Sequence, residues 1–201
     1  MRNFRLRYAR KDIIIDYKRG YTKKQLNLFD QVEPRIEEND MAKVLTVYYT
    51  WGGITKKLAE QIHAAAGGDI LEIEAETPYT TDYKACVEQA RKEVQEGYKP
   101  PLKTKIPDLS GYDVILAGCP NWISTFAPPM ATFLSGANLA GKTVAPFCTF
   151  GGGGAGNIVK DVTAWCSGAK IADILAVKGE TIKDAPFPEA DLSAWLKKAG
   201  L

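Results

Sequence analysis

This sequence has few residues from which a metal site or a covalent cross-link could be built. It contains one histidine, His63, and four cysteines, no two of which form a Cys-x-x-Cys pair. Structural zinc sites of the usual Cys/His spacing are therefore excluded. Cys119 and Cys148 each close an apolar run, which predicts small buried hydrophobic side chains. Reduced cysteines of this kind are typical of a cytoplasmic protein.

Strong net charge and long hydrophobic segments are also missing. The formal net charge is +2, and a dedicated nucleic-acid binder would usually be more basic. The apolar run at residues 13–15 is too short for the core of a signal peptide. Residues 114–159 carry a single charge, Lys142, but prolines and a glycine run interrupt them, which excludes a membrane-spanning helix. This neutral stretch predicts core strands and an uncharged site.

The composition changes near residue 41 and divides the chain into an N-terminal extension, residues 1–40, and one domain, residues 41–201. The extension has one alanine and one glycine, with basic residues in its first part and acidic residues in its second. Three interpretations stay open: a basic arm that meets nucleic acid or acidic surfaces, an arm that packs on the domain or on a partner subunit, and a non-native segment before a true start at Met41.

From Met41 onward, β-branched apolar runs alternate with segments of helical periodicity. The runs predict buried strands over residues 43–49, 69–74, 114–118, 143–149 and 171–177. Apolar spacing predicts helices over residues 56–66, 83–97, 130–134, 157–166 and 192–199, with Tyr83, Val87, Ala90 and Val94 on one face of the second and Asp191 capping the last. This alternation indicates an α/β fold with a parallel sheet covered by helices on both faces.

Three loops are expected at the carboxyl ends of the strands, where such folds bind ligands near the switch point of the strand order. They are residues 50–55, 119–128 and 149–156, and none contains a charged residue. The wider segments 114–141 and 143–159 contain no Asp or Glu. We therefore predict a binding site without carboxylates beside it.

The first loop, Thr-Trp-Gly-Gly-Ile-Thr at residues 50–55, joins a strand to a helix. Its two glycines allow close approach to the backbone, and its N–H groups with the helix N-terminus form a site for an anion. No Gly-Lys precedes Thr55, so the loop is not a Walker A motif. Lys56 and Lys57 begin the helix, where the helix dipole disfavours cations, and a bound phosphate would offset that cost. We expect a phosphate here, the alternative being a turn without a ligand.

Aromatic residues occupy matching places in the other two loops. Trp122 follows the third strand and Phe150 the fourth, which predicts a planar ring ligand beside the phosphate. The run Gly151–Gly156 formally matches Gly-x-Gly-x-x-Gly, but Asp173 falls too early in its strand for the ribose of a dinucleotide. We interpret these glycines as positions where backbone N–H groups approach a ligand.

The three loops resemble those of the flavodoxin family in its short-chain form. The similarity rests on residues 48–55, 120–123 and 148–157 and covers about residues 42–180 in order. It implies a flavodoxin-like, doubly wound, five-stranded parallel sheet of order 2-1-3-4-5 that binds FMN, with the phosphate in the first loop and the ring between the other two. The residues that it implies in cofactor binding are Thr50, Trp51, Gly52, Gly53, Ile54, Thr55, Pro120, Asn121, Trp122, Ile123, Thr149, Phe150, Gly151, Gly152, Gly153 and Gly154.

The resemblance implies an FMN-binding oxidoreductase or electron-transfer protein that serves a redox partner protein, with the flavin carrying the chemistry. Carrier flavodoxins are usually strongly acidic, whereas residues 42–201 carry 16 Lys or Arg and 17 Asp or Glu. An NAD(P)H-dependent quinone or flavin reductase is therefore kept as an alternative.

A flavin-free binding module of the same fold is the other alternative. Gly52 and Ile54 stand where the family usually has Ser and Asn. Each missing polar contact is typically worth about 1 kcal/mol. Ile123 replaces a second aromatic residue, and Ser124 stands where glycine is common.

Overall fold

A computed structural model describes residues 42–201 of this chain. The extension, residues 1–40, lies outside the described residues, so its three interpretations stay predictions. No helix within residues 42–201 is long and apolar enough to cross a membrane.

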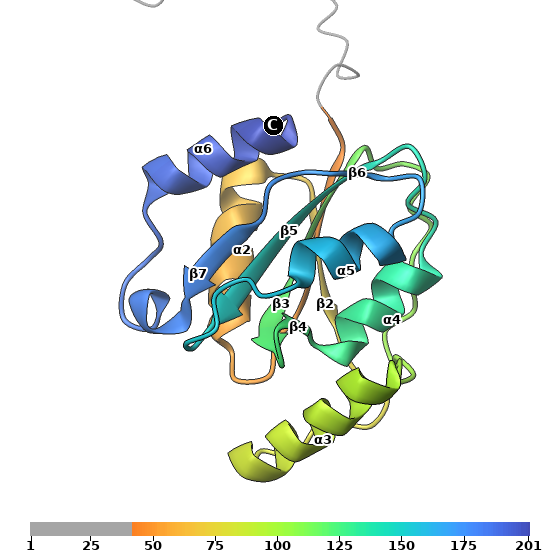
Figure 1. The fold of residues 1–201 in the computed structure, drawn as a ribbon. Helices are drawn as coiled ribbons and strands as arrows, with labels where there is room; N and C mark the ends of the chain where they lie inside the picture. The colour runs from red at the N-terminus through yellow and green to blue at the C-terminus, as the bar shows by residue number, and fades with distance from the viewer. Residues whose placement is uncertain (1–41) are drawn as a thin grey trace, which may run out of the picture. The chain divides into compact units, whose positions relative to one another are not determined.

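The domain is built on a parallel sheet whose strands follow the predicted order (Figure 1). The neighbours β2, β1, β3 and β5 pair in that sequence, and two short strands complete the far edge. Counted as five strands along the chain, this is the doubly wound order 2-1-3-4-5, which confirms the predicted fold class. The bounds are β1 (Val44–Tyr49), β2 (Asp69–Ile73), β3 (Val114–Trp122), β5 (Thr143–Phe150), β6 (Lys170–Ile171) and β7 (Leu175–Lys178).

The fifth strand is interrupted, whereas its apolar pattern predicted a continuous run. β6 pairs with the start of β5 and β7 with its end, which leaves residues 172–174 outside both strands. The carbonyl of Asp173 accepts a hydrogen bond from Trp195 Nε1 at 2.7 Å. The prediction was wrong here because a side chain of another element replaces a strand as partner of this backbone group.

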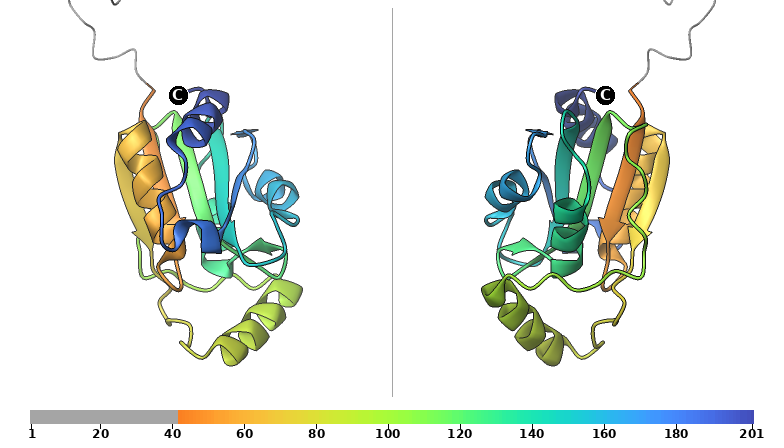
Figure 2. Two further views of the ribbon diagram at one scale, coloured as in Figure 1. Left: turned by 90° about the vertical axis from the view of Figure 1, so that its left-hand side faces the viewer. Right: turned by 90° about the vertical axis from the view of Figure 1, so that its right-hand side faces the viewer.

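Helices cover both faces of the sheet (Figure 2). α2 (Ile54–Ala66) and α6 (Glu189–Ala199) pack on one face, and α4 (Pro128–Gly136) and α5 (Ile158–Trp165) on the other. Successive side chains of β1 enter opposite cores, which explains why this strand is apolar throughout. α6 begins after Pro188, so Asp191 lies in its first turn and is not the predicted cap.

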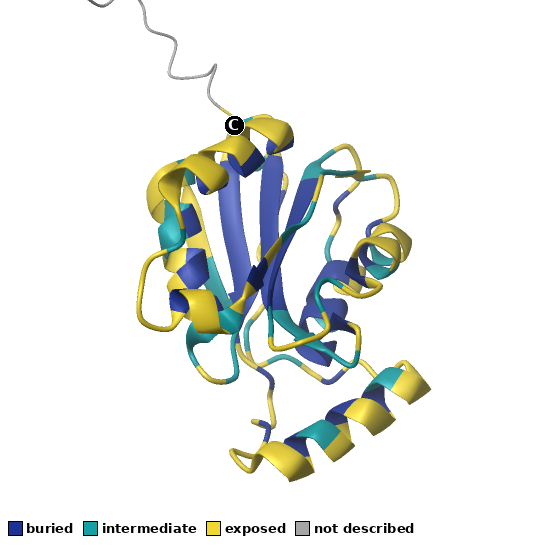
Figure 3. Ribbon diagram, turned by 60° about the vertical axis from the view of Figure 1, so that its left-hand side comes forward, coloured by how far each residue is buried: buried dark blue, intermediate teal, exposed yellow. Residues whose placement is uncertain are grey.

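α3 (Tyr83–Glu96) lies beyond the carboxyl ends of the strands rather than on a face of the sheet (Figure 3). Its buried residues are Cys86, Ala90 and Glu93, and Tyr83 is 70% exposed. Of the predicted face, Ala90 is buried and Val87 and Val94 are half-buried, so the prediction was wrong at Tyr83, and Cys86 and Glu93 were not predicted. Apolar periodicity missed the buried face because one of its members is a carboxylate, Glu93, which is buried by hydrogen bonding and not by hydrophobicity.

The cysteines behave as small hydrophobic residues. All four are unpaired and buried, which confirms the prediction for Cys119 and Cys148. Burial raises the pKa of the Cys148 thiol to about 12 and that of Cys119 well above its usual value. Both thiols therefore stay protonated at neutral pH and are poor nucleophiles.

We expect a chain that begins at Met41 to keep this fold. Both cores and the sheet are formed within residues 44–199, so removing residues 1–40 takes away no described element. The midpoint of thermal unfolding should shift by no more than about 2–4 °C, the effect of roughly 1 kcal/mol at this size. Melting of both chains followed by circular dichroism measures the shift. An insoluble product would show that the extension belongs to the fold.

Candidate functional site

A cleft of about 620 Å³ opens at the carboxyl ends of β1, β3 and β5, where the strand order changes direction. Four of the predicted site residues, Gly53, Gly152, Gly153 and Gly154, do not line it. The structure brings the other twelve together in the cleft lining: Thr50, Trp51, Gly52, Ile54, Thr55, Pro120, Asn121, Trp122, Ile123, Thr149, Phe150 and Gly151.

The loop between β1 and α2 presents free backbone donors at the start of a helix. Within the described chain, the N–H groups of Trp51, Gly52, Ile54 and Thr55 have no protein acceptor. Gly53 has a φ of 81°, which glycine adopts without strain, and its N–H donates to Thr50 Oγ1 at 3.1 Å. Four unpaired donors at a helix N-terminus form a site for an anion.

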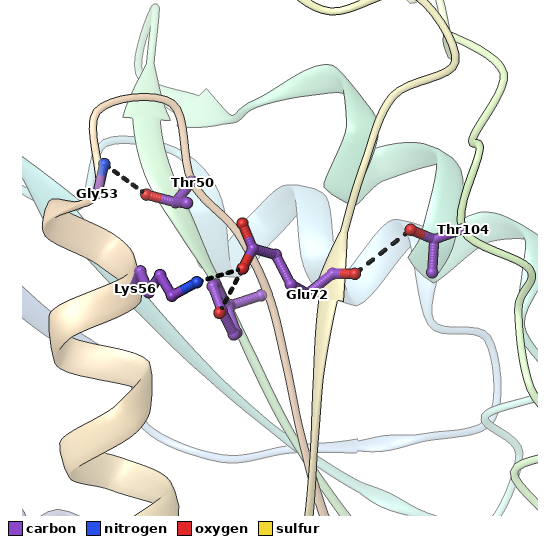
Figure 4. A network of polar contacts seen from close by, with 6 residues as sticks. Thr50, Gly53, Lys56, Glu72 and Thr104 are labelled. Atoms are coloured by element: carbon purple, nitrogen blue, oxygen red, sulfur yellow. Dashed lines mark hydrogen bonds and ion pairs between the residues drawn. The ribbon is translucent and has the colours of Figure 1, made fainter.

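The two lysines that follow this loop are held away from it. Lys56 Nζ lies 3.0 Å from Glu72 Oε2 (Figure 4). The same oxygen accepts a hydrogen bond from the Tyr48 hydroxyl at 2.7 Å. The hydrogen bond to Glu72 raises the pKa of Lys56. Lys57 Nζ donates to the carbonyl of Lys183 at 2.7 Å. An anion in the loop would therefore be held by neutral groups and the helix dipole.

A buried pair of hydroxyls joins the first loop to the third. Thr55 Oγ1 lies 2.8 Å from Thr149 Oγ1, and both residues line the cleft. Two hydroxyls carry two protons, and their mutual bond uses one. One hydroxyl proton is thus left for an acceptor in the cleft.

Trp122 is fixed by other aromatic rings. Its ring meets Tyr79 at 4.9 Å and Tyr49 at 5.9 Å between centroids, both edge to face. The Tyr79 hydroxyl in turn donates to the buried Glu93 carboxylate. Burial, followed by this hydrogen bond, raises the pKa of Tyr79, which therefore remains a donor. These contacts hold the Trp122 ring in one orientation at the cleft wall.

A tight hairpin that the sequence did not predict shapes the second loop. β3 continues to Trp122 and turns back as the short antiparallel strand β4 (Thr125–Phe126). The two turn residues, Ile123 and Ser124, have φ of 51° and 65°, the positive values of a two-residue hairpin turn. Such a φ is a true outlier for a β-branched isoleucine.

Two hydrogen bonds join this hairpin to the glycine-rich third loop. Asn121 Nδ2 donates to the carbonyl of Gly154 at 2.5 Å, and the N–H of Asn157 donates to the carbonyl of Ser124 at 2.6 Å. Gly156 lies so close that a Cβ there would be 2.4 Å from the Ser124 oxygen. The second and third loops therefore form one connected unit.

Sequence reasoning missed two groups of lining residues. The first is a set on α3: Tyr83, Cys86, Val87 and Ala90. The second lies at the end of β7 and in the following 3-10 helix (Gly179–Ile182), and it includes Lys178 and Glu180, whose side chains pair at 2.7 Å. The expectation of a site without carboxylates was therefore wrong. The end of the fifth predicted strand lies at the same sheet edge, and that signal could have found Lys178 and Glu180.

Comparison with known proteins agrees with this architecture. The family model for flavodoxin matches residues 43–199, well over half of the chain. No curated protein matches the sequence significantly. A Bacteroides eggerthii protein of known structure, classed as a flavoprotein, is 28% identical, with a TM-score of 0.69 over 80% of this chain and 99% of its own. A Lactobacillus acidophilus flavoprotein, solved in complex with FMN, is 26% identical, with a TM-score of 0.60 over 77% of this chain and 99% of its own. This chain belongs to the flavodoxin family.

Proposed function

We propose that this chain binds FMN in the cleft and acts as an electron-transfer flavoprotein. The observation that carries the proposal is the set of free N–H groups at the start of α2, in the same cleft as Trp122 and Phe150. The Lactobacillus relative crystallised with FMN supports the choice of ligand. When bound, FMN would supply the redox chemistry. The protein would supply binding, orientation and the electrostatic environment.

The residues of the cleft fit the two halves of FMN. A Cβ placed at Gly52 or Gly53 would meet nothing within 4 Å, so the backbone of this loop is open to a ligand. Its free N–H groups and the Thr55 hydroxyl would hold the phosphate. Trp122 and Phe150 would flank the ring. The asparagine and serine that Ile54 and Gly52 replace are not needed for this donor set, because the backbone provides most of it.

Titration with FMN tests the proposal. We expect FMN fluorescence to be quenched on binding, because Trp122 and Phe150 line the cleft, and the loaded protein to be yellow. A protein that remains colourless and leaves the fluorescence of FMN unchanged would contradict the proposal and favour the flavin-free binding module.

Thr55→Val should weaken FMN binding much more than riboflavin binding. Riboflavin lacks the phosphate, and a hydrogen bond to a charged group is worth about 1.5–3 kcal/mol, so the Kd for FMN should rise roughly 10- to 100-fold. Fluorescence titration with both ligands gives the ratio. Thr149→Val is the matched control, because it breaks the same Thr55–Thr149 bond and keeps the Thr55 hydroxyl. If the ratio of the Kd for FMN to the Kd for riboflavin changes equally in the two variants, a phosphate contact by Thr55 is refuted.

An NAD(P)H-dependent quinone or flavin reductase is the second candidate function. The apolar side chains of α3 favour it, because they extend the cleft beyond the three flavin loops. Anaerobic mixing of the FMN-loaded protein with NADPH distinguishes the two functions. Rapid bleaching of the flavin, with turnover when a quinone is added, would favour the reductase, and flavin that stays oxidised would favour the carrier.

A further inference from the structure

A pair of opposite charges stands at the edge of the cleft, beside the first loop rather than in it. Lys178 and Glu180 both line the cleft, and their side chains meet at 2.7 Å. Lys178 is the last residue of β7, and Glu180 lies in the 3-10 helix that follows. Within residues 42–201, Lys178 is the only lysine or arginine of the cleft lining. It is therefore the cation of the described chain that a bound anion would meet in this cleft.

The surrounding contacts place Lys178 between the first loop and the third. In the parallel pairing of β5 with β7, Lys178 lies opposite Phe150 (Figure 1). The next residue, Gly179, lies against the first loop, since a Cβ there would be 3.4 Å from Ile54 Cγ2. The whole 3-10 helix packs on α2. Lys178 is thus one residue away from a contact with the loop whose free N–H groups form the anion site.

The ion pair holds Lys178 only weakly in its present position. The side chains of Lys178 and Glu180 are 50% and 77% exposed, and exposed ion pairs add little to stability because water screens them. The hydrogen bond from Lys178 lowers the pKa of Glu180, so this carboxylate is charged at neutral pH. A lysine ammonium sits on a flexible aliphatic chain and can change its partner at small cost. Lys56 also pairs with a carboxylate, but it does not line the cleft.

A phosphate group is a stronger partner for Lys178 than Glu180 is. A phosphate monoester such as FMN carries about 1.5 to 2 negative charges at neutral pH and offers three acceptor oxygens. A hydrogen bond between an ammonium and a phosphate is charge-assisted at both ends. The first loop itself supplies neutral donors, so a cation from the edge of the sheet would add to them without displacing one. Glu180 would then face a like charge, which opposes its return to Lys178.

We propose that Lys178 exchanges Glu180 for the phosphate of FMN when the cofactor binds, and that this exchange makes the cleft select FMN over riboflavin. The inference rests on the proposed function, because it assigns a further residue to the site of the same cofactor. Glu180 keeps the cation at the edge of the cleft in the free protein and competes with the phosphate for it.

Fluorescence titration of the full chain with FMN and with riboflavin tests the exchange. Lys178→Met removes the cation and keeps a long aliphatic side chain. The Kd for FMN should rise about three- to tenfold at low salt, with that for riboflavin unchanged, because riboflavin has no phosphate. Lys178→Arg keeps the charge and should keep the Kd for FMN within about twofold of the wild type. Glu180→Gln removes the competing carboxylate and should lower the Kd for FMN about twofold or more.

The salt dependence gives a second measurement. The contact lies at an exposed edge, so the difference in FMN affinity between the wild type and Lys178→Met should shrink as salt is raised from about 20 mM to about 500 mM. The affinity for riboflavin should not change with salt in either protein. A difference in FMN affinity that is independent of salt would overturn the exchange.

Lys183→Met is the matched control, because it removes the same charge from an exposed position of the same segment that does not line the cleft. It should leave both dissociation constants unchanged. Equal effects of Lys178→Met and Lys183→Met on FMN would overturn the exchange, since they indicate a long-range effect of charge and no contact. Equal losses for FMN and riboflavin in Lys178→Met would overturn it as well. A wild-type chain that binds neither flavin contradicts the proposed function itself, whereas FMN binding that Lys178→Met leaves unchanged contradicts this inference alone.

Discussion

Gly118→Ala is expected to lower the midpoint of thermal unfolding by about 6–12 °C. A Cβ at Gly118 in β3 would lie 2.0 Å from Cε2 of Phe147, which faces it on β5. The Phe147 ring is fully buried and packs edge-on against Trp195 at 6.3 Å, so moving it would disturb the core. Overpacking of this kind costs about 3 kcal/mol, and each kcal/mol shifts the midpoint by about 2–4 °C in a domain of this size. Melting followed by circular dichroism measures the change.

Two further variants separate this clash from a general effect of alanine. Gly111→Ala adds a Cβ that meets nothing within 4 Å, and its midpoint should stay near that of the wild type. Phe147→Leu in the Gly118→Ala background removes the ring atoms that the new Cβ would meet. The double variant should lose less stability than the two single variants lose together. If the two single losses of stability simply add in the double variant, the contact between the new Cβ and the Phe147 ring is contradicted.

Gly156→Ala is expected to raise the Kd for FMN about tenfold or more, with a similar loss for riboflavin. The residue has a φ of 57°, which costs an alanine about 1–2 kcal/mol. Its Cβ would also lie 2.4 Å from the backbone oxygen of Ser124. The third loop must move away from the second, which breaks the bond from the N–H of Asn157 to Ser124. Part of the binding free energy would then be spent on bringing the two loops back together around the ring. A cost of about 1.4 kcal/mol corresponds to a tenfold rise in Kd.

The matched control is Gly141→Ala, in the turn before β5 at the opposite end of the sheet. This glycine has a φ of 77° but no atom within 4 Å of a built Cβ, so it tests backbone strain without the clash. It should lower stability slightly and leave both flavin affinities unchanged. Equal losses of affinity in the two variants would show that strain and not loop contact is responsible. Fluorescence titration with FMN and riboflavin measures both.

Much of the fold could be predicted from the sequence because its signals are local. The run Val44–Tyr49 is apolar at every position since both faces of β1 are covered, and no neighbour needs to be known to recognise such a strand. Alternation of strands and helices then restricts the order of the sheet, because parallel crossovers have one hand. The three uncharged loops follow from the ends of three strands. Their meeting in one cleft is a consequence of the strand order alone.

Only the tertiary structure decided what completes the cleft. α3 lies at the strand ends, where Glu93 bonds to Tyr79 and the Tyr79 ring packs against Trp122, and a carboxylate carries no apolar signal in the sequence. Lys56 and Lys57 are turned from the first loop by Glu72 and by the carbonyl of Lys183, which are distant in the chain. Ile123 adopts a positive φ, against its own preference, since the hairpin and its bonds to the third loop outweigh local strain. Periodicity and composition indicate which side chains of a segment are buried and which are exposed. These features depend instead on which distant group forms a hydrogen bond with a buried charge or a backbone donor.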